Sequence, residues 1–418
     1  MNFQPGEQPI KQETVPFVPV KDLQADFTDN QWYCHLARQT VYFSAYSLED
    51  FTREHAIELA RNITTLAPQL LSSYKRDEPG APLCDKVLEE IISVEKVTDL
   101  SPYPNKWSMV GQDIFERADL PLFRIKVAAL NEGKDPQGNA AMILVLSTHS
   151  LFEGDDAVKL SRSQPVTRSP VTARPSPVSR FKKLSYRMLA GVLAPIQLLA
   201  AHTLAPRVAD VGFRSIVFER AKIRRVAAEL EIRQQSLMFA LATFALNDGG
   251  RGFSKKSIST IYADLSRNED FQTNDDYFSF RMIDLKLKVE DDFETYAKGV
   301  EAALQVAEAG DKAATQLLLN AMFAAHRWLN ERFSFLYTPQ LFRFSAGYDM
   351  TLSMVPPQRM GGGMTMGLVE PVFTGTYHPG FNMCVFAPGR KFVTFNFGLR
   401  AKHLDKVDDI IRLLARFE

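Results

Sequence analysis

The sequence predicts a two-lobed α/β or α+β fold in which each lobe contains a mixed β-sheet. The chain has 418 residues, which is enough for two domains, and 45% of them are hydrophobic, which is ample for buried cores. Helical and strand patterns alternate over two separate stretches, and strand patterns often follow one another directly. We expect an extended proline-rich arm over 1–20, an N-terminal lobe over 21–160, a basic linker with an apolar helix over 161–210, and a C-terminal lobe over 211–418.

The first lobe is predicted to open with a helix in the segment "YSLEDFTREHAIELARNI". Ser47 and Asp50 have the spacing of a capping box, which places the start of the helix at Ser47. Apolar residues then recur close to one helical face, which predicts these buried positions: Phe51, Leu59, Ile63 and Leu66.

Two strands are predicted next, over Leu120–Leu130 and Ala141–Thr148. Both segments are rich in residues that favour strands. The connection "NEGKDPQGN" contains glycine, proline, asparagine and aspartate, which are the common residues of turns. The pair is therefore predicted to form a β-hairpin.

The second lobe returns to helices and then to strands. Helical patterns begin at "VFERAKIRRVAAELEIRQQSLMFALATFALND", strands are predicted in "KKSISTIYADL" and "DYFSFRMIDLKL", and two further helices cover 291–310 and 313–333. The last part of the chain alternates turns and strands before a closing helix in "KVDDIIRLLARF".

The composition favours a cytoplasmic protein with no nucleic-acid partner. Lysine plus arginine and aspartate plus glutamate both number 49, so the net charge is zero and the whole-molecule field gives no reason to expect nucleic acid or an acidic partner. Cys34, Cys84 and Cys384 are far apart and odd in number, which indicates reduced thiols rather than a disulfide or zinc framework. The first 20 residues lack the pattern of a signal peptide.

The segment 157–209 combines basic and apolar character. It contains lysine and arginine but no aspartate or glutamate; its first part is rich in serine, proline and threonine, and its second part, "MLAGVLAPIQLLAAHTLAP", is almost entirely apolar. The apolar part is marginal in length for a membrane span. Two interpretations stay open: peripheral contact with a membrane through 157–209, or a solvated linker followed by a helix packed on the protein.

The most unusual motif follows the second strand of the hairpin, in "AMILVLSTHSLFEGDDAV". A buried strand leads directly into Thr148 and His149, and then into Glu153, Gly154 and two aspartates. On the residues alone, His149 could hydrogen-bond the next loop, with Gly154 in a tight turn. No partner histidine has metal-ligand spacing, no GxSxG elbow of a serine hydrolase occurs, and the glycine-rich "MGGGM" lacks the lysine of a phosphate loop.

The segment "THSLFEG" resembles a degenerate form of the HHxxxDG motif of the CoA-dependent acyltransferase superfamily, which includes condensation domains and chloramphenicol acetyltransferase. Five further segments resemble the wax ester synthase/diacylglycerol acyltransferase branch and follow the order of that family. They are "LPLFRI", "KIRRVAAELEI", "YADLSRNEDFQTNDDYF", "SMVPPQ" and "KFVTFNFGLRAKHLDKVDDI". The resemblance covers the chain from about residue 100 to its end.

Several positions depart from the family pattern. Thr148 stands where the family has the first histidine, Glu153 where it has aspartate, and Met354 where it has the asparagine of "SNVPGP". The segment "RQQSLM" also replaces the small polar residues of the family at the start of a helix in the second lobe. The second histidine of the motif, which is the catalytic one in the family, is retained as His149.

The resemblance implies chloramphenicol acetyltransferase-like lobes with a tunnel between them and a general base, His149. It implies that Glu153 holds the catalytic loop and that backbone N–H groups near Gly154, or the Ser353 region, stabilise the oxyanion. Thr148, Ser353 and Asn396 are expected to contact substrate. Around Ser353, the "SMVPPQ" segment could equally be a plain turn.

No bound cofactor is implied; acyl-CoA or an acyl carrier protein would serve as co-substrate. Arg267 and Asn274 are expected to be structural or to lie at the tunnel rim. The abundance of phenylalanine and methionine fits an acyl-chain tunnel, but it fits an ordinary core better.

The leading hypothesis is an acyltransferase that moves an acyl group from a thioester to the hydroxyl of a lipid-like acceptor. An amide-forming condensation enzyme keeps the same chemistry with an amine acceptor. A binding or scaffold protein that has lost catalysis is the alternative from another class, and Thr148, Glu153 and Met354 favour it.

Overall fold

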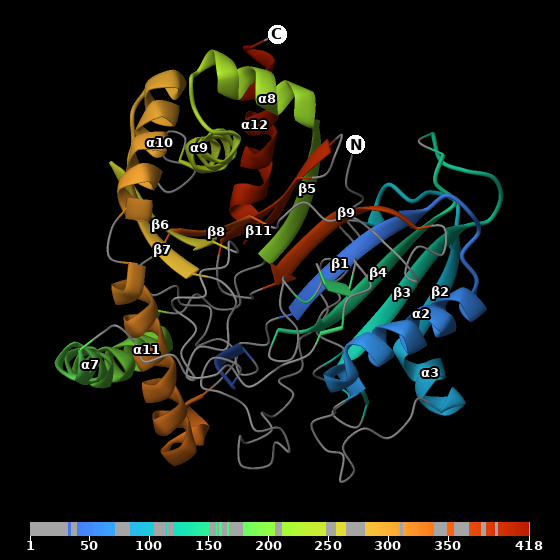
Figure 1. Cartoon of the computed structure of the whole chain (residues 1–418), viewed down its shortest axis with the longest axis horizontal. Helices are drawn as coiled ribbons and strands as arrows, with labels where there is room; N and C mark the ends of the chain where they lie inside the picture. The colour runs from blue at the N-terminus through green and yellow to red at the C-terminus, as the bar shows by residue number, and fades with distance from the viewer. Residues whose placement is uncertain are drawn as a thin grey trace.

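The strands form two separate mixed β-sheets, each flanked by helices (Figure 1). This computed structural model describes residues 32–34, 40–71, 84–103, 114, 117, 120–136, 138–149, 156, 159–160, 165–166, 179–204, 211–247, 256–264, 281–309, 312–337, 349–354, 368–377, 382–388 and 392–417. The predicted arm over 1–20, most of the linker up to 178, Arg267 and Asn274 lie outside the described residues.

The first sheet, sheet A, has five strands in the order β2-β3-β4-β1-β9. Only β2 and β3 are parallel to each other; the other neighbours are antiparallel. Helices α2 (Arg53–Leu66) and α3 (Asp85–Ile91) lie against β2 and β3. The strands are β1 (Thr40–Ser47), β2 (Ile92–Val97), β3 (Phe123–Leu130), β4 (Ala141–Thr148) and β9 (Leu368–Tyr377).

The second sheet, sheet B, has six strands in the order β5-β11-β10-β8-β6-β7. Strand β8 pairs in parallel with both β10 and β6, and the remaining pairs are antiparallel. Both sheets are therefore mixed, as the sequence predicts. The strands are β5 (Val211–Glu219), β6 (Ser257–Asp264), β7 (Arg281–Lys288), β8 (Met350–Met354), β10 (Met383–Pro388) and β11 (Phe392–Arg400).

Helices from the second half of the chain gather on one face of sheet B (Figure 1). Aromatic rings fill the layer between these helices and the sheet. The ring centroid of Phe239 in α9 lies 5.3 Å from that of Phe386 in β10, and the Phe386 centroid lies 4.8 Å from that of Phe395 in β11. The closing helix was predicted correctly. The helices are α8 (Arg220–Glu229), α9 (Gln234–Leu246), α10 (Phe293–Ala309) and α12 (Val407–Ala415).

Strand β9 links the two halves of the chain. It lies far beyond β4 in the sequence, yet it pairs with β1 at the edge of sheet A and also contacts β10 and β11 of sheet B. Strand β9 lies in the segment 211–418 that was predicted to form the C-terminal lobe, yet it completes sheet A. The lobe boundaries themselves stay a prediction.

The predicted hairpin is confirmed, whereas the predicted capping box is wrong. Strands β3 and β4 are antiparallel neighbours. Helix α2, however, begins at Arg53 and is capped by Thr52, whose hydroxyl accepts from the His55 N–H at 3.4 Å. Ser47 cannot start a helix because it pairs with Ala141 in the extended backbone of β1.

The apolar segment before the second lobe forms helix α7 (Arg180–Leu204), as predicted, and α7 packs against α11 (Lys312–Arg332). Among the helices that the structure describes, none is long and apolar enough to cross a membrane. His326 of α11 joins the two helices through its Nε2, which lies 3.0 Å from Oε1 of Gln197, while its Nδ1 lies 3.0 Å from the Tyr337 hydroxyl. Burial lowers the pKa of His326 from 6.5 to about 4.

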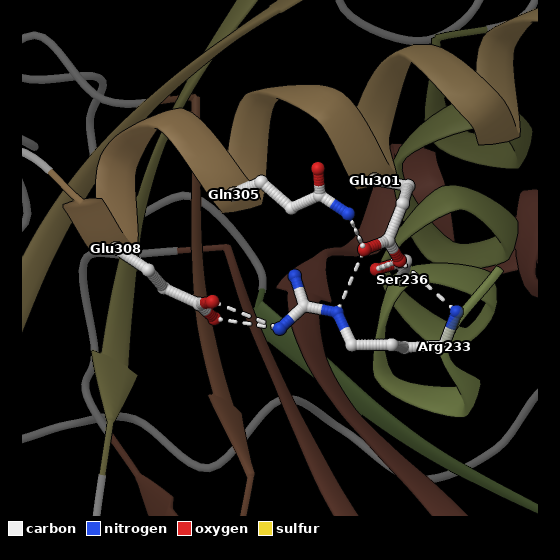
Figure 2. A network of polar contacts seen from close by, with 5 residues as sticks. All are labelled: Arg233, Ser236, Glu301, Gln305 and Glu308. Carbon is white, nitrogen blue, oxygen red and sulfur yellow. Dashed lines mark hydrogen bonds and ion pairs between the residues drawn. The ribbon is translucent and has the colours of Figure 1, made fainter.

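A buried carboxylate, Glu301 of α10, anchors the start of α9 (Figure 2). It accepts hydrogen bonds from the Ser236 hydroxyl at 2.6 Å and the Arg233 backbone N–H at 3.0 Å, where the helix dipole favours a negative charge. The Arg233 Nε and the Gln305 amide, each at 2.8 Å, complete the cluster. Burial alone raises the pKa of Glu301, but these donors and the charge of Arg233 outweigh it and hold the pKa below its usual value.

Replacing Glu301 with Gln is expected to lower the free energy of unfolding by about 2 kcal/mol at neutral pH, because buried charge-assisted hydrogen bonds are lost. The folded pKa is lowered, so this stabilisation is complete above the ordinary pKa of 4.5 and is lost as the pH falls through the folded value. Urea unfolding of both proteins across the acid range measures the difference. Glu308→Gln is the control, since its pair with Arg233 is more exposed and should be worth less than about 1 kcal/mol.

His326 is expected to make the protein less stable in mild acid. Above pH 6.5 the ring is neutral in the folded and unfolded chain; as the pH falls toward 4, the unfolded chain binds the proton first, which removes up to roughly 3 kcal/mol. Urea titrations of wild type and His326→Gln should converge over this window. An identical pH profile for His326→Gln would contradict this assignment.

Candidate functional site

The candidate site begins at the end of β4, which is buried along its whole length between β3 and β1. Pairing continues to the last residue of the strand: Thr148 is in register with Thr40 of β1, and its N–H lies 3.4 Å from the Leu122 carbonyl. The Ser147 hydroxyl donates to the same carbonyl at 2.8 Å. These bonds hold Thr148 in place, and its side chain is fully buried.

His149 follows Thr148 in the first turn after the strand and is only 8% exposed. Its Nδ1 atom is shielded from solvent. The structure thus confirms that a buried strand leads directly into His149, and in Figure 1 this end of β4 points toward the middle of the molecule. Glu153 and Gly154 lie outside the described residues.

A buried arginine, Arg124, shares this end of sheet A and was not among the site residues predicted from the sequence. It is 4% exposed and donates to the carbonyls of Pro121 at 2.6 Å and Phe123 at 2.8 Å. Arg124 is in register with Leu146, so its side chain lies on the same face of the sheet as Thr148. The sequence did contain a signal for a buried charge: Arg124 is the only charged residue in the otherwise apolar segment "LPLFRI".

Asp156 is a second buried charge near His149 in the sequence. It is 7% exposed, and its Oδ1 lies 3.8 Å from the Nζ of Lys159. Within the described part of the chain, no group of three or more His, Cys, Asp or Glu side chains could hold a metal ion.

Two other predicted site residues, Ser353 and Asn396, lie on one row of sheet B. The register places Ser215 of β5, Asn396 of β11, Val385 of β10 and Ser353 of β8 side by side. Side chains alternate along a strand, and Phe395 packs on the helix-covered face, so this row points away from those helices. The sequence thus named two residues that the fold brings onto one face.

Asn396 has unused hydrogen-bonding capacity. Its side chain is only 4% exposed, and its Oδ1 accepts from the Ser215 hydroxyl at 2.7 Å. Its Nδ2 is buried and, in the residues described, has no hydrogen-bond partner. A buried donor without a partner lowers stability, so such a group marks a position where a ligand could accept the bond.

Comparison with solved structures identifies the fold. The trichothecene 15-O-acetyltransferase TRI3 from Fusarium sporotrichioides matches 96% of this chain and 99% of its own with a TM-score of 0.55 at 12% identity. The wax ester synthase/diacylglycerol acyltransferase from Marinobacter aquaeolei VT8 matches 94% and 97% with a TM-score of 0.54 at 11% identity. The EpoB NRPS cyclization-docking bidomain from Sorangium cellulosum matches 96% and 86% with a TM-score of 0.52 at 12% identity.

The protein has the condensation-domain and CoA-dependent acyltransferase fold. This confirms the predicted fold class of two helix-flanked mixed sheets. No family model matches the sequence, and a search of curated proteins finds no match. The solved structures thus agree, at the level of the fold, with the resemblance seen in the sequence, whereas the tunnel and the roles of the individual residues stay predictions.

The side chain of Asn396 is expected to contribute little to the free energy of unfolding. In Asn396→Leu the unpartnered donor disappears while Ser215 loses its acceptor, so the free energy of unfolding should change by less than about 1 kcal/mol. The double variant Ser215→Ala/Asn396→Leu removes both polar groups and should be more stable than wild type by about 1 kcal/mol. Thermal and urea unfolding test both, with Thr394→Val on the same strand face as the control; a large loss for Asn396→Leu would show a structural role.

Proposed function

We propose that the protein is an acyltransferase that transfers an acyl group from a thioester to the hydroxyl of a lipid-like acceptor, with His149 as general base. The observation that carries the proposal is the buried imidazole directly after the buried strand β4 in a fold shared with acyltransferases. Acyl-CoA or an acyl carrier protein would supply the thioester.

His149 would act on the acceptor. A neutral imidazole accepts the hydroxyl proton as the acceptor oxygen attacks the thioester carbonyl. The tetrahedral intermediate then collapses, the carbon–sulfur bond breaks, and the departing sulfur receives the proton from the imidazolium. The products are an ester and a free thiol, and no acyl-enzyme is needed.

The oxyanion of the intermediate needs hydrogen-bond donors. The buried Nδ2 of Asn396 can donate without breaking an existing bond of its own among the described residues, which supports a substrate-contacting role. Ser353, half-buried on the same row, and backbone N–H groups near Gly154 are further candidate donors. Thr148 is fully buried, which favours a part in shaping the site over contact with bulk solvent.

The choice of a hydroxyl acceptor rests on two fold neighbours whose names describe O-acyl transfer, the Fusarium acetyltransferase and the Marinobacter wax ester synthase/diacylglycerol acyltransferase. The third neighbour belongs to a nonribosomal peptide synthetase, so an amine acceptor is the related alternative. A catalytically inactive binding protein is a second candidate function, because Thr148 and Glu153 replace residues of the family motif.

Replacing His149 with Ala is expected to lower acyl transfer at least about 100-fold, because a positioned general base typically contributes that much. Purified wild type and variant would be given acyl-CoA thioesters of several chain lengths with a panel of alcohols and amines, while thiol release is followed and products are identified by mass spectrometry. His55→Gln, at an exposed histidine that caps α2, controls for the loss of a histidine as such. Circular dichroism verifies that each variant is folded.

Unchanged turnover in His149→Ala would exclude the general-base role. If the wild-type protein binds thioesters saturably but transfers no acyl group, the binding-protein alternative would be favoured. If the products are amides, the condensation-enzyme alternative would be favoured. The Asn396→Leu variant belongs in the same assay, since retained stability with slower transfer distinguishes an oxyanion donor from a structural residue.

A further inference from the structure

Helix α7 carries a stripe of exposed apolar side chains along its whole described length. They recur three or four positions apart, so they lie on one face of the helix. Each is between 54% and 81% exposed, although large apolar residues are usually buried. The stripe consists of Phe181, Leu184, Met188, Val192, Ile196 and Leu199.

The other side of α7 is docked on the protein. Ala190 and Ala194 are fully buried, and Leu198 nearly so, in the same cluster as Ala321 and Met322 of α11. The Gln197–His326 contact adds a polar link between the two helices. In Figure 1, α7 lies at the periphery beside α11, away from both sheets. The helix is thus held in place while its apolar stripe faces outward.

Basic residues accompany the stripe. Arg180, Lys182, Lys183 and Arg187 lie in the first turns of α7, and the helix contains no aspartate or glutamate. Arg180 and Arg187 are exposed. A second copy of α7 would therefore offer these cations no acidic partner, whereas an anionic lipid surface would match both the charge and the stripe.

We propose that α7 is a membrane-docking helix that lies in the plane of an anionic lipid surface, with the stripe in the headgroup–acyl boundary and the basic residues on lipid phosphates. The apolar face and the cationic flank are the two features that such interfacial helices combine. This inference does not depend on the proposed chemistry. If both hold, docking would bring a bilayer-dissolved acceptor to the enzyme.

Co-sedimentation of the purified full-length protein with vesicles tests the proposal. Wild type should bind vesicles of phosphatidylcholine with phosphatidylglycerol more tightly than phosphatidylcholine alone, and added salt should weaken this preference. Val192→Asp, in the centre of the stripe, should weaken binding at least about tenfold. Arg180→Gln and Arg187→Gln should each weaken it about fivefold on anionic vesicles only.

Val306→Asp is the matched control, because it makes the same change at an exposed valine, 73% exposed on α10, outside the stripe. Equal binding by wild type and Val192→Asp, or no binding by wild type, would overturn the proposal. So would a lipid-free dimer, seen by light scattering, that Val192→Asp converts to monomers, since the stripe would then join two copies. His149→Ala should bind vesicles like wild type, which separates a failure of docking from a failure of catalysis.

Discussion

Strand β4 is buried on both faces and paired on both edges, and the rest of the structure depends on this constraint. A strand covered on both faces and paired on both edges cannot shift its register without exposing apolar side chains and breaking two ladders. Its end is consequently a fixed point in the molecule, reinforced by the bonds of Ser147 and Thr148 to the Leu122 carbonyl. Chemistry that demands an accurately placed imidazole is best built at such a point, and His149 occupies it.

Sheet B uses its two faces differently. Phenylalanine rings under α9 supply cohesion on one face, while Asn396 and Ser353 place polar groups on the other, where an unpartnered amide lowers stability. The Glu301 cluster shows the opposite solution, in which each carboxylate oxygen of a buried acid receives hydrogen bonds. The carboxylate of Glu301 is thus satisfied within the protein, whereas the Asn396 Nδ2 has no hydrogen-bond partner among the described residues.

Local patterns in the sequence predicted most of the elements, because each has a regular recurrence of apolar residues or a connection rich in turn residues. These elements include the β3–β4 hairpin, α7, α10, α11 and the closing helix. The start of α2 was mispredicted, since the pairing of Ser47 with Ala141 overrides a local capping signal. The position of β9 could not be read locally, because strand pairing across distant segments leaves no periodic trace. His149 and Asn396 emerged as candidates from motif order, whereas the burial of Arg124 and the exposed stripe of α7 depend on tertiary packing.

The crossing of β9 between the sheets has a consequence for biosynthesis. Strand β1 forms an edge of sheet A with unpaired backbone groups until β9 has been synthesised and Tyr377 can pair with Thr40. The other strands of sheet A, β2, β3 and β4, are synthesised long before that point. Sheet A is therefore completed only when most of the chain has left the ribosome, and this long-range pairing makes folding slow. During that interval the nascent chain is prone to edge-to-edge aggregation, so its yield in cells should depend on chaperones more than its final stability does.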